Sequence, residues 1–268
     1  MEISSIPNER GTLPIPTYPD LVGKVAVVTG GSGGIGAATC RALAANGVKV
    51  AVNGRDEAKI AAVVSDIQAH GGQALGVAAD VTDFAAIERM RRQVEQTLGP
   101  VEVLAVFAAS GGPPPSPLAQ ISEEGWRAAI DGNLTATFLT LKSFLPGMIE
   151  RGHGAIVTMA SSAGRVPTPA PIAYAAAKAG VVMLSRQVAA EVGKHGIRVN
   201  CLAPDTIMTE RTQRYMSAEQ QQQWTAAFPL GRMGTPEDVA LATLFLSSAS
   251  SAWLTGVTLD LAGGKIML

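Results

Sequence analysis

The stretch "KVAVVTGGSGGIGAATCRALAANG", residues 24–47, decides the fold. It opens with "VAVVT", a β-branched apolar run typical of a strand buried on both faces of a parallel sheet. The glycines that follow allow a tight turn, and the alanine-rich segment after them favours a helix that ends at Gly47. We therefore expect a strand, a glycine loop and a helix whose N-terminus favours a phosphate.

The same alternation of short apolar runs and helical segments continues to the C-terminus. Further strands are expected at 48–53, 73–80, 101–109, 154–161, 196–204 and 256–262, and further helices at about 56–70, 82–98, 122–150, 172–194 and 236–248. Asp56 should cap the first of these helices, and Thr82 or Asp83 the second. The pattern predicts an α/β protein with a single doubly wound parallel sheet of about seven strands and helices on both faces.

Three segments fall outside this alternation. Residues 1–20 have acid and proline where a signal peptide would need a basic start and an apolar stretch, so we expect an extended arm before a single domain at 21–268. Residues 110–117, "SGGPPPSP", predict a loop at the carboxyl end of a strand. Residues 206–232 are polar and are expected to form a helical lid over the substrate, with their four consecutive glutamines facing solvent.

Composition excludes several classes of function. The net charge of −1 gives no electrostatic footprint for nucleic acid, and no apolar run reaches the roughly 18 residues of a membrane span. The two cysteines, Cys40 and Cys201, lack disulfide or zinc spacing, and the three histidines form no metal-spaced pair. We expect a cytoplasmic protein with no metal site and with neither nucleic acid nor membrane as a partner.

The glycine loop "TGGSGGIG", residues 29–36, fits two dinucleotide-binding patterns. The pattern GxGxxG is matched by Gly31, Gly33 and Gly36, and TGxxxGxG by Gly30, Gly34 and Gly36. Because the loop lies between a buried strand and a helix, its backbone can approach a pyrophosphate, and we expect a bound dinucleotide. In such sheets, ligands bind beyond the carboxyl ends of the strands.

The end of the second strand, "VNGRDE", bears on the choice of dinucleotide. Gly54 stands where an acid would bind the ribose hydroxyls of NAD, and the guanidinium of Arg55 would bind a 2′-phosphate. Asp56, about 20 residues beyond the last glycine, is the competing acid, although a helix cap explains it better. The segment favours NADP(H), with NAD(H) as the alternative.

Taken in order, the motifs resemble the short-chain dehydrogenase/reductase family, in its 3-oxoacyl-reductase-like subgroup, over about residues 20–268. The matching residues are TGxxxGxG at 29–36, Asp80-Val81, Asn133, Ser161, and Tyr174 and Lys178 of the YxxxK pattern in "IAYAAAKAG" (172–180), together with "RVNCLAP" and "TGVTLDLAGG". The resemblance implies a Rossmann-like oxidoreductase that interconverts a small carbonyl compound and its alcohol, in a homo-oligomer, tetramer or dimer. Together with Arg55, the residues expected to contact the cofactor are Gly30, Ser32, Gly34, Ile35, Gly36, Asp80, Val81, Ala108, Tyr174, Lys178, Ile207 and Thr209.

The spacing of Tyr174 and Lys178 has a chemical purpose. Residues i and i+4 share one helix face, and an adjacent cation would lower the tyrosine pKa from about 10 toward neutrality. We hypothesise that Tyr174 is the general acid for ketone reduction and the base for alcohol oxidation. The family implies that Lys178 also holds the nicotinamide ribose and that Asn133 organises a water that relays protons through Lys178. A buried asparagine that bonds only the backbone is the alternative for Asn133.

Two serines compete for the position that would hydrogen-bond the substrate oxygen. Ser161 lies three residues before Gly164 and 13 before Tyr174, as the family pattern requires. We therefore assign the role to Ser161 and expect Ser162 to be an exposed neighbour on the same turn.

Two departures from the family pattern keep other functions open. Val106-Phe107-Ala108-Ala109 replaces the usual Asn-Asn-Ala-Gly and loses the asparagine side-chain contacts between strands, and Pro204-Asp205 replaces Pro-Gly and puts an acid beside the nicotinamide pocket. An NADP-binding regulatory protein with little turnover and an enoyl-thioester reductase are therefore the alternatives to a carbonyl reductase. A 3-oxoacyl thioester or a hydrophobic ketone is the expected substrate, because the lid contributes the large side chains of Met208, Tyr215, Met216, Trp224 and Phe228.

Overall fold

Parallel strands form one sheet in the computed structural model, which describes residues 15–109 and 114–268. Within these residues the seven strands are β1 (Val25–Thr29), β2 (Lys49–Gly54), β3 (Ala74–Ala78), β4 (Val101–Val106), β5 (Gly154–Met159), β6 (Ile197–Pro204) and β7 (Thr258–Leu261). Their order across the sheet is β3-β2-β1-β4-β5-β6-β7, and every neighbouring pair is parallel. The strand order reverses between β1 and β4, which creates the crevice where ligands of such sheets bind. The predicted doubly wound sheet is confirmed.

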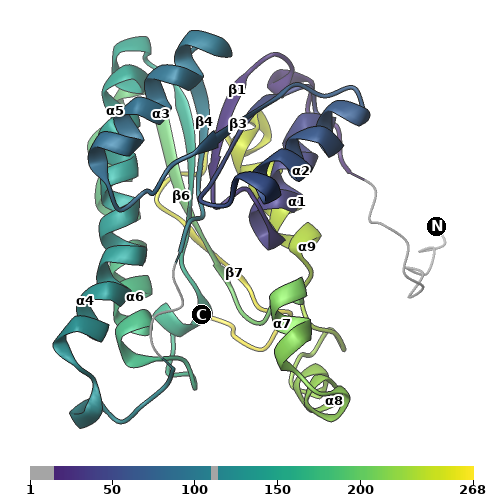
Figure 1. Ribbon diagram of the computed structural model, residues 1–268, viewed down its shortest axis with the longest axis vertical. Helices are drawn as coiled ribbons and strands as arrows, with labels where there is room; N and C mark the ends of the chain where they lie inside the picture. Colours follow the sequence, from purple (N-terminus) through teal and green to yellow (C-terminus); the bar gives the residue numbers. More distant parts are fainter. Residues whose placement is uncertain (1–14, 110–113) are drawn as a thin grey trace.

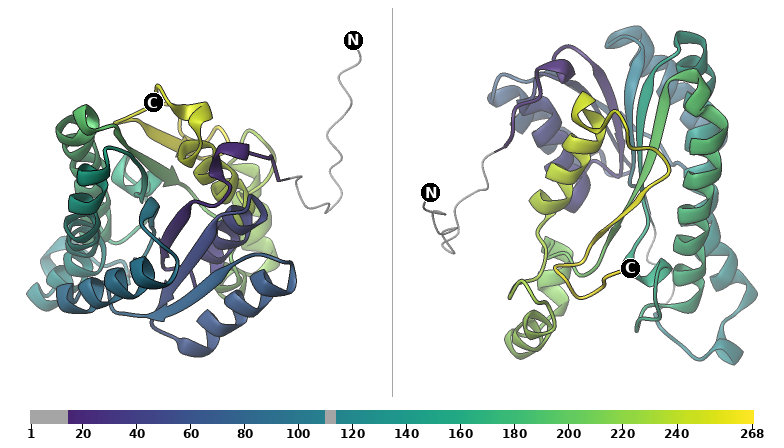
Figure 2. Two further views of the ribbon diagram at one scale, coloured as in Figure 1. Left: turned by 90° about the horizontal axis from the view of Figure 1, so that it is seen from above. Right: turned by 180° about the vertical axis from the view of Figure 1, so that it is seen from behind.

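Helices cover both faces of the sheet, as Figure 1 and Figure 2 show. One face carries α1 (Gly34–Ala45), α2 (Glu57–Ala69) and α9 (Pro236–Ser247), and the other carries α3 (Phe84–Thr97), α4 (Glu123–Ile130), α5 (Ala136–Arg151) and α6 (Ile172–Val192). Successive residues of a strand point to opposite faces, so Ala26 and Val28 join the core under α1 and α9, while Val25 and Val27 join the core under α3 and α5. Burial on both faces explains the unbroken apolar run of β1.

The helix expected at about 122–150 contains a change in its winding. A π-helical segment, Asp131–Thr135, separates α4 from α5 and contains Asn133. The side-chain amide of Asn133 donates to the carbonyl oxygen of Ala129 (2.8 Å), the acceptor that a regular helix would offer to the backbone amide of residue 133. Single-turn π segments occur frequently at functional sites.

Side-chain caps begin α2 and α3. The carboxylate of Asp56 accepts from the backbone amide of Lys59 (3.1 Å), which confirms the predicted cap. At α3 the capping carboxylate is that of Asp83, which accepts from the backbone amide of Ala85 (2.9 Å), so Asp83 and not Thr82 is the N-cap residue.

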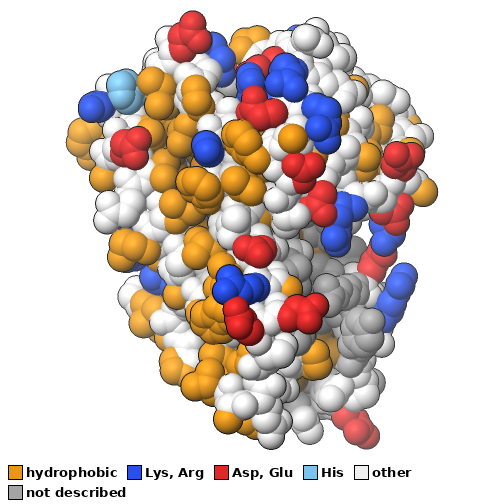
Figure 3. All heavy atoms as spheres, turned by 60° about the vertical axis from the view of Figure 1, so that its left-hand side comes forward, with side chains coloured by type: hydrophobic (Ala, Val, Ile, Leu, Met, Phe, Trp, Pro, Cys, Tyr) orange, Lys and Arg blue, Asp and Glu red, His pale blue; other side chains and the backbone are white. Residues whose placement is uncertain are grey.

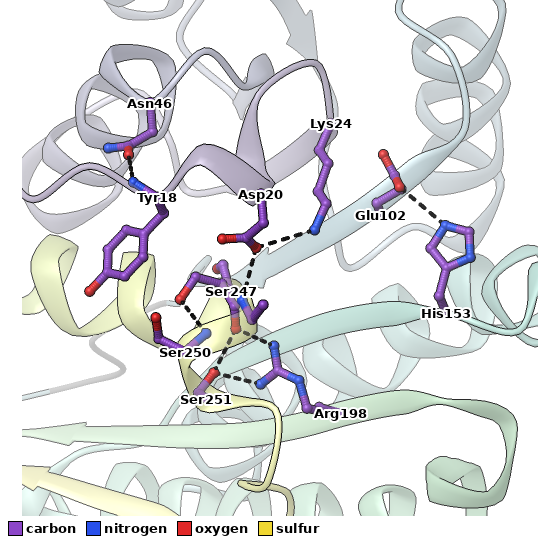
Figure 4. Close-up of polar contacts among 12 residues, drawn as sticks. Tyr18, Asp20, Lys24, Asn46, Glu102, His153, Arg198, Ser247, Ser250 and Ser251 are labelled. Atoms are coloured by element: carbon purple, nitrogen blue, oxygen red, sulfur yellow. Dashed lines mark hydrogen bonds and ion pairs between the residues drawn. The ribbon is translucent and has the colours of Figure 1, made fainter.

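The end of the predicted N-terminal arm, residues 15–20, docks on the folded domain. The backbone amide of Tyr18 donates to the side chain of Asn46 just after α1 (2.7 Å), as Figure 4 shows. Asp20 accepts from the backbone amide of Ala249 beyond α9 (2.8 Å). The rest of the arm lies outside the described residues.

The segment 206–232 folds into two short helices, α7 (Glu210–Tyr215) and α8 (Ala218–Ala226). They lie beyond α9, at the end of the molecule that also holds the C-terminus (Figure 1). Gln220, Gln222 and Gln223 of the glutamine run are exposed, as expected, whereas Gln221 is partly buried and donates to the carbonyl oxygen of Met216 (3.3 Å). Of the predicted loop 110–117, the first four residues lie outside the described part. Among the described residues, the helices lack the length and apolarity needed to cross a membrane.

Candidate active site

The glycine loop after β1 packs tightly against itself. A Cβ atom on Gly36 would lie 2.1 Å from the carbonyl oxygen of Gly30, so only glycine fits at position 36. Gly30 itself has a positive φ of 70°, which glycine adopts without strain. This turn sets the N-terminus of α1 at the carboxyl end of the sheet, where a phosphate is electrostatically favoured.

Thr29 connects the two central strands at the point where the strand order reverses. Its hydroxyl oxygen accepts from the backbone amides of Phe107 (3.0 Å) and Ala108 (3.1 Å), at the end of β4. These bonds join the strand ends where the family's usual asparagines are missing. Thr29 was not predicted as a site residue, although it is the first residue of the TGxxxGxG pattern.

A cavity of about 240 Å³ opens at the carboxyl ends of β1, β2, β3 and β4. It brings together the predicted cofactor residues Gly30, Ser32, Arg55, Asp80, Val81 and Ala108. Asn53 and Gly54 also line it, and neither was predicted as a contact. Asn53 is buried, and its side-chain amide donates to the carbonyl oxygens of Val77 (3.1 Å) and Ala79 (3.2 Å), so it links the end of β2 to β3.

Charge and space in this cavity bear on the choice of nucleotide. Arg55 is exposed at its edge. Asp80 accepts from the backbone amide and the hydroxyl of Thr82 (2.9 and 2.8 Å), and these bonds, with the charge of Arg55, hold its carboxyl pKa below the usual range. A Cβ atom on Gly54 would lie 2.5 Å from the hydroxyl oxygen of Ser32, so an acid at position 54 would require Ser32 to move.

Other predicted cofactor residues lie outside the lining of this cavity. Gly34 and Thr209 line a neighbouring cavity of about 710 Å³, where the Thr209 methyl group would lie 3.2 Å from a Cβ on Gly34. Ile207 is buried in the core under α9, and Ile35 is partly buried against the same core. Contacts from these two residues to a nucleotide would therefore come from their backbone. Within the described residues, His, Cys, Asp and Glu side chains form no cluster that could hold a metal ion.

Tyr174 and Lys178 lie on one face of α6, at the end of β5. The Lys178 side chain is buried, and its Nζ lies 5.5 Å from the centroid of the Tyr174 ring. The ammonium donates to the carbonyl oxygen of Met159, the last residue of β5 (2.8 Å). Burial lowers the pKa of Lys178 to about 8, against a smaller opposing effect of Cys201. The structure thus brings the predicted tyrosine and lysine together.

The expected lowering of the tyrosine pKa is not found in the protein chain alone. Burial raises the pKa of Tyr174 above its usual value, and a hydrogen bond with Ser161 offsets part of the rise. The physical reason is that the ammonium of Lys178 lies over the ring and is hydrogen-bonded to Met159, while desolvation of the phenolate dominates. The phenol therefore keeps its proton at neutral pH.

The two candidate serines differ in their partners. Ser161 is partly exposed and hydrogen-bonds Tyr174. Ser162 is buried, with 6% of its surface exposed, and its hydroxyl bonds the carboxylate of Asp205. The expectation of an exposed Ser162 is therefore wrong, because Asp205 supplies an acceptor inside the fold. Asn133 is fully buried in the π segment, which packs against α6.

A cavity of about 570 Å³ lies next to Ser161, between the Ser161 turn, α8 and the C-terminal tail. Asp205 lies in its wall, where it accepts from Lys265 Nζ (2.9 Å) and from the amide of Thr206 (2.8 Å). Burial disfavours its charge, but hydrogen bonds from Lys265, Ser162 and Thr206 prevail and keep the pKa of the carboxyl below its usual range. Lys265 was not predicted; it is distant in sequence and belongs to no motif.

The sheet, the glycine loop and the Ser161, Tyr174 and Lys178 group define a Rossmann-type oxidoreductase. The family model for short chain dehydrogenases matches residues 24–220, and the chain belongs to this family. It is therefore an NAD(P)-dependent oxidoreductase that acts on CH–OH and C=O groups.

Known relatives support this assignment over nearly the whole chain. The chain is 36% identical over 245 residues to the 3-oxoacyl-[acyl-carrier-protein] reductase FabG of Chlamydia muridarum (91% of this chain, 98% of the relative). It is 40% identical over 229 residues to a protein of Xanthobacter autotrophicus named inactive 2-(S)-hydroxypropyl-CoM dehydrogenase 2 (84% and 97%). A solved 3-oxoacyl-[acyl-carrier protein] reductase with bound NAD from Brucella melitensis superposes with a TM-score of 0.87 at 30% identity (100% and 99%).

Proposed function

We propose that this protein reduces a ketone or 3-oxoacyl group to the secondary alcohol, or catalyses the reverse reaction, with Tyr174 as the general acid and base. The observation that carries the proposal is the grouping of Ser161, Tyr174 and Lys178 at the end of β5. Ser161 hydrogen-bonds the phenol, and the buried ammonium lies over the same ring. A protonated phenol in this position suits proton donation to a carbonyl oxygen.

The proton path follows from these contacts. In the reduction, the Tyr174 hydroxyl gives its proton to the substrate oxygen, while Ser161 hydrogen-bonds that oxygen as negative charge develops. A bound nicotinamide would supply the hydride that the carbonyl carbon accepts. Lys178 would hold its ribose, and Asn133 would order a water that returns a proton to Tyr174 through Lys178.

The residues around the glycine loop fit a dinucleotide, and we favour NADP(H) over NAD(H). The close approach of Gly36 to Gly30 leaves the backbone free of side chains where a pyrophosphate would lie. Arg55 offers a guanidinium for a 2′-phosphate, and the Ser32 hydroxyl fills the space that an acid at position 54 would need. NAD is the alternative, since the solved reductase from Brucella melitensis carries it.

An apolar face supports a homo-oligomer. Trp126, Phe138, Ile172 and Met183, from α4, α5 and α6, are each at least one-third exposed. Figure 3 shows hydrophobic side chains gathered on this side of the molecule. Exposed apolar patches of this kind commonly mark protein interfaces, so we propose that two copies pair through these helices.

A regulatory protein with little turnover is the second candidate. It is favoured by the replacement of the asparagines after β4 and by the relative whose name describes it as inactive. Enoyl-thioester reduction is a third reaction that the same nicotinamide site could carry.

Turnover assays distinguish these functions. NADPH and NADH oxidation should be followed with hydrophobic ketones, 3-oxoacyl thioesters and enoyl thioesters, with Tyr174→Phe as the control variant. We expect NADPH-dependent reduction of a carbonyl substrate and a loss of at least about 100-fold in Tyr174→Phe. Tight NADPH binding with no turnover on any substrate would support the regulatory protein, and wild-type rates in Tyr174→Phe would contradict the assigned proton donor.

A further inference from the structure

The cavity beside Ser161 contains a charged group that the proposed reaction does not use. Lys265 lies in the C-terminal tail, four residues after β7, and its side chain is about one-third exposed (32%). Its ammonium lies 5.1 Å from the ring centroids of both Trp224 and Phe228, at the end of the lid. Ring faces and a carboxylate together hold this cation at the cavity wall.

The backbone around Lys265 fixes its position. Its amide donates to the carbonyl oxygen of Ala262 (2.9 Å), and Gly263 accepts from the amide of Leu230 at the end of the lid (3.1 Å). The amide of Asp205 donates to the carbonyl oxygen of Leu261 (3.1 Å). The tail is thus bonded both to the lid and to the end of β6, so the ammonium is held in place before any substrate enters.

Asp205 and Lys265 differ in how much of their hydrogen-bonding capacity the protein uses. The Asp205 carboxylate is 5% exposed and accepts from Lys265, Ser162 and both polar groups of Thr206. Among the described residues, Lys265 Nζ donates one hydrogen bond, to Asp205. An ammonium has three N–H donors, so donors remain for an acceptor that enters the cavity.

We propose that Lys265 is a substrate-binding residue that determines specificity: its ammonium donates to a second oxygen of the substrate, so that carbonyl compounds with an additional acceptor oxygen are preferred over simple ketones. This inference rests on the proposed carbonyl reduction, whose reacting oxygen lies at Ser161 and Tyr174. The second oxygen then lies at another part of the wall of the same cavity, which Ser161 and Lys265 both line.

The test compares two substrates of equal chain length, ethyl 3-oxobutanoate and 2-heptanone, which differ in the additional oxygens. Lys265→Met keeps most of the side-chain length and removes the donors. We expect its kcat/KM for the oxo ester to fall about tenfold or more, because a hydrogen bond to a charged donor is lost, and its kcat/KM for 2-heptanone to stay within about twofold of wild type. Lys194→Met, at an exposed lysine after α6, is the matched control and should change neither value.

A purely structural role for Lys265 predicts a different result. Equal losses on both substrates, or no loss on either, would overturn the proposal. Because Lys265→Met leaves Asp205 without its cation, the double variant Asp205→Asn/Lys265→Met is measured in parallel and should show the same selective loss. Melting temperatures of all the variants show whether the fold is kept.

Ligand binding provides a readout that does not depend on turnover. Trp224 lines the cavity, so its fluorescence can be followed after Trp126 and Trp253 are replaced by Phe. We expect ethyl 3-oxobutanoate to change the signal in this background and to lose about tenfold in affinity with Lys265→Met. If the wild-type protein reduces neither substrate, the proposed function fails. If Lys265→Met binds ethyl 3-oxobutanoate as tightly as the protein with Lys265 does, only the inference about Lys265 fails.

Discussion

The ammonium of Lys178 donates to the carbonyl oxygen of Met159 at 2.8 Å, and this bond directs a buried cation to the end of β5. In the described part of the chain, this buried ammonium thus has a backbone carbonyl oxygen, and not a carboxylate, as its hydrogen-bond acceptor. Burial of a charge costs folding free energy, so a buried lysine at this position fits the catalytic role that we propose for it.

The lowered pKa of Lys178 predicts that the difference in free energy of unfolding between the wild type and Lys178→Met depends on pH. Its value is lowered from 10.5 to about 8, so between pH 8 and 10.5 the unfolded chain binds more protons than the folded one. The contribution of this group to stability therefore rises with pH across that window, by about 3 kcal/mol in all. Relative to the wild type, Lys178→Met should gain free energy of unfolding below pH 8, because it lacks the buried charge. This relative gain should be lost by pH 10.5.

Chemical unfolding of both proteins from pH 7 to 10.5 checks this prediction. The difference between the two free energies of unfolding removes the titrations that the proteins share. Lys194→Met serves as a control for the loss of an exposed lysine and should show a flat difference. A difference for Lys178→Met that stays constant, or grows, with rising pH would contradict the depressed pKa.

The raised pKa of Tyr174 predicts different pH profiles for the two directions of the reaction. Because burial raises this pKa, the phenol is protonated through neutral pH and serves as an acid. Reduction should therefore be nearly flat between pH 6 and 8, while oxidation, which needs the phenolate, should rise toward alkaline pH. Ser161→Ala removes the hydrogen bond that lowers the pKa and should move the oxidation profile to higher pH. Oxidation that is faster at pH 6 than at pH 9 would refute this assignment.

Much of the fold could be predicted because it depends on local patterns. The buried run of β1 and the caps at Asp56 and Asp83 are each determined by a few neighbouring residues. The i, i+4 spacing of Tyr174 and Lys178 likewise places both on one helix face wherever the helix lies.

The features that could not be predicted depend on contacts between distant segments. Lys265 meets Asp205 across 60 residues, and Ser162 is buried because that same carboxylate accepts its hydroxyl. The raised pKa of Tyr174 reflects how deeply the tertiary packing buries the phenol, which helix spacing alone does not reveal. Thr29 links β1 to β4 across nearly 80 residues.

The turn that carries Ser161 approaches α6 so closely that position 164 has room only for glycine. A Cβ atom at this position would lie 2.6 Å from the backbone of Lys178 and Ala179, and neither of the two backbone segments can move aside easily. We expect Gly164→Ala to lower the free energy of unfolding by about 1–3 kcal/mol and to reduce kcat more than tenfold, because the turn that carries Ser161 must shift. Gly193→Ala is the matched control: it has helical backbone and no atoms within 4 Å of the new Cβ, so it should be neutral or slightly stabilising. Equal behaviour of the two variants would show that the approach is not tight.

Substitutions at positions 32, 54 and 55 should reverse the preference for NADPH that we propose. Arg55→Ala removes the guanidinium that we assign to the 2′-phosphate, so the Kd for NADPH should rise about tenfold or more while that for NADH changes little. Gly54→Asp alone should bind both nucleotides poorly, because the new Cβ would meet the Ser32 hydroxyl at 2.5 Å. Adding Ser32→Gly makes room for the carboxylate, which can then bind the ribose hydroxyls of NADH and repel a 2′-phosphate. Isothermal titration with both nucleotides measures each step, and a triple variant Ser32→Gly/Gly54→Asp/Arg55→Ala that still prefers NADPH would place the 2′-phosphate away from the end of β2.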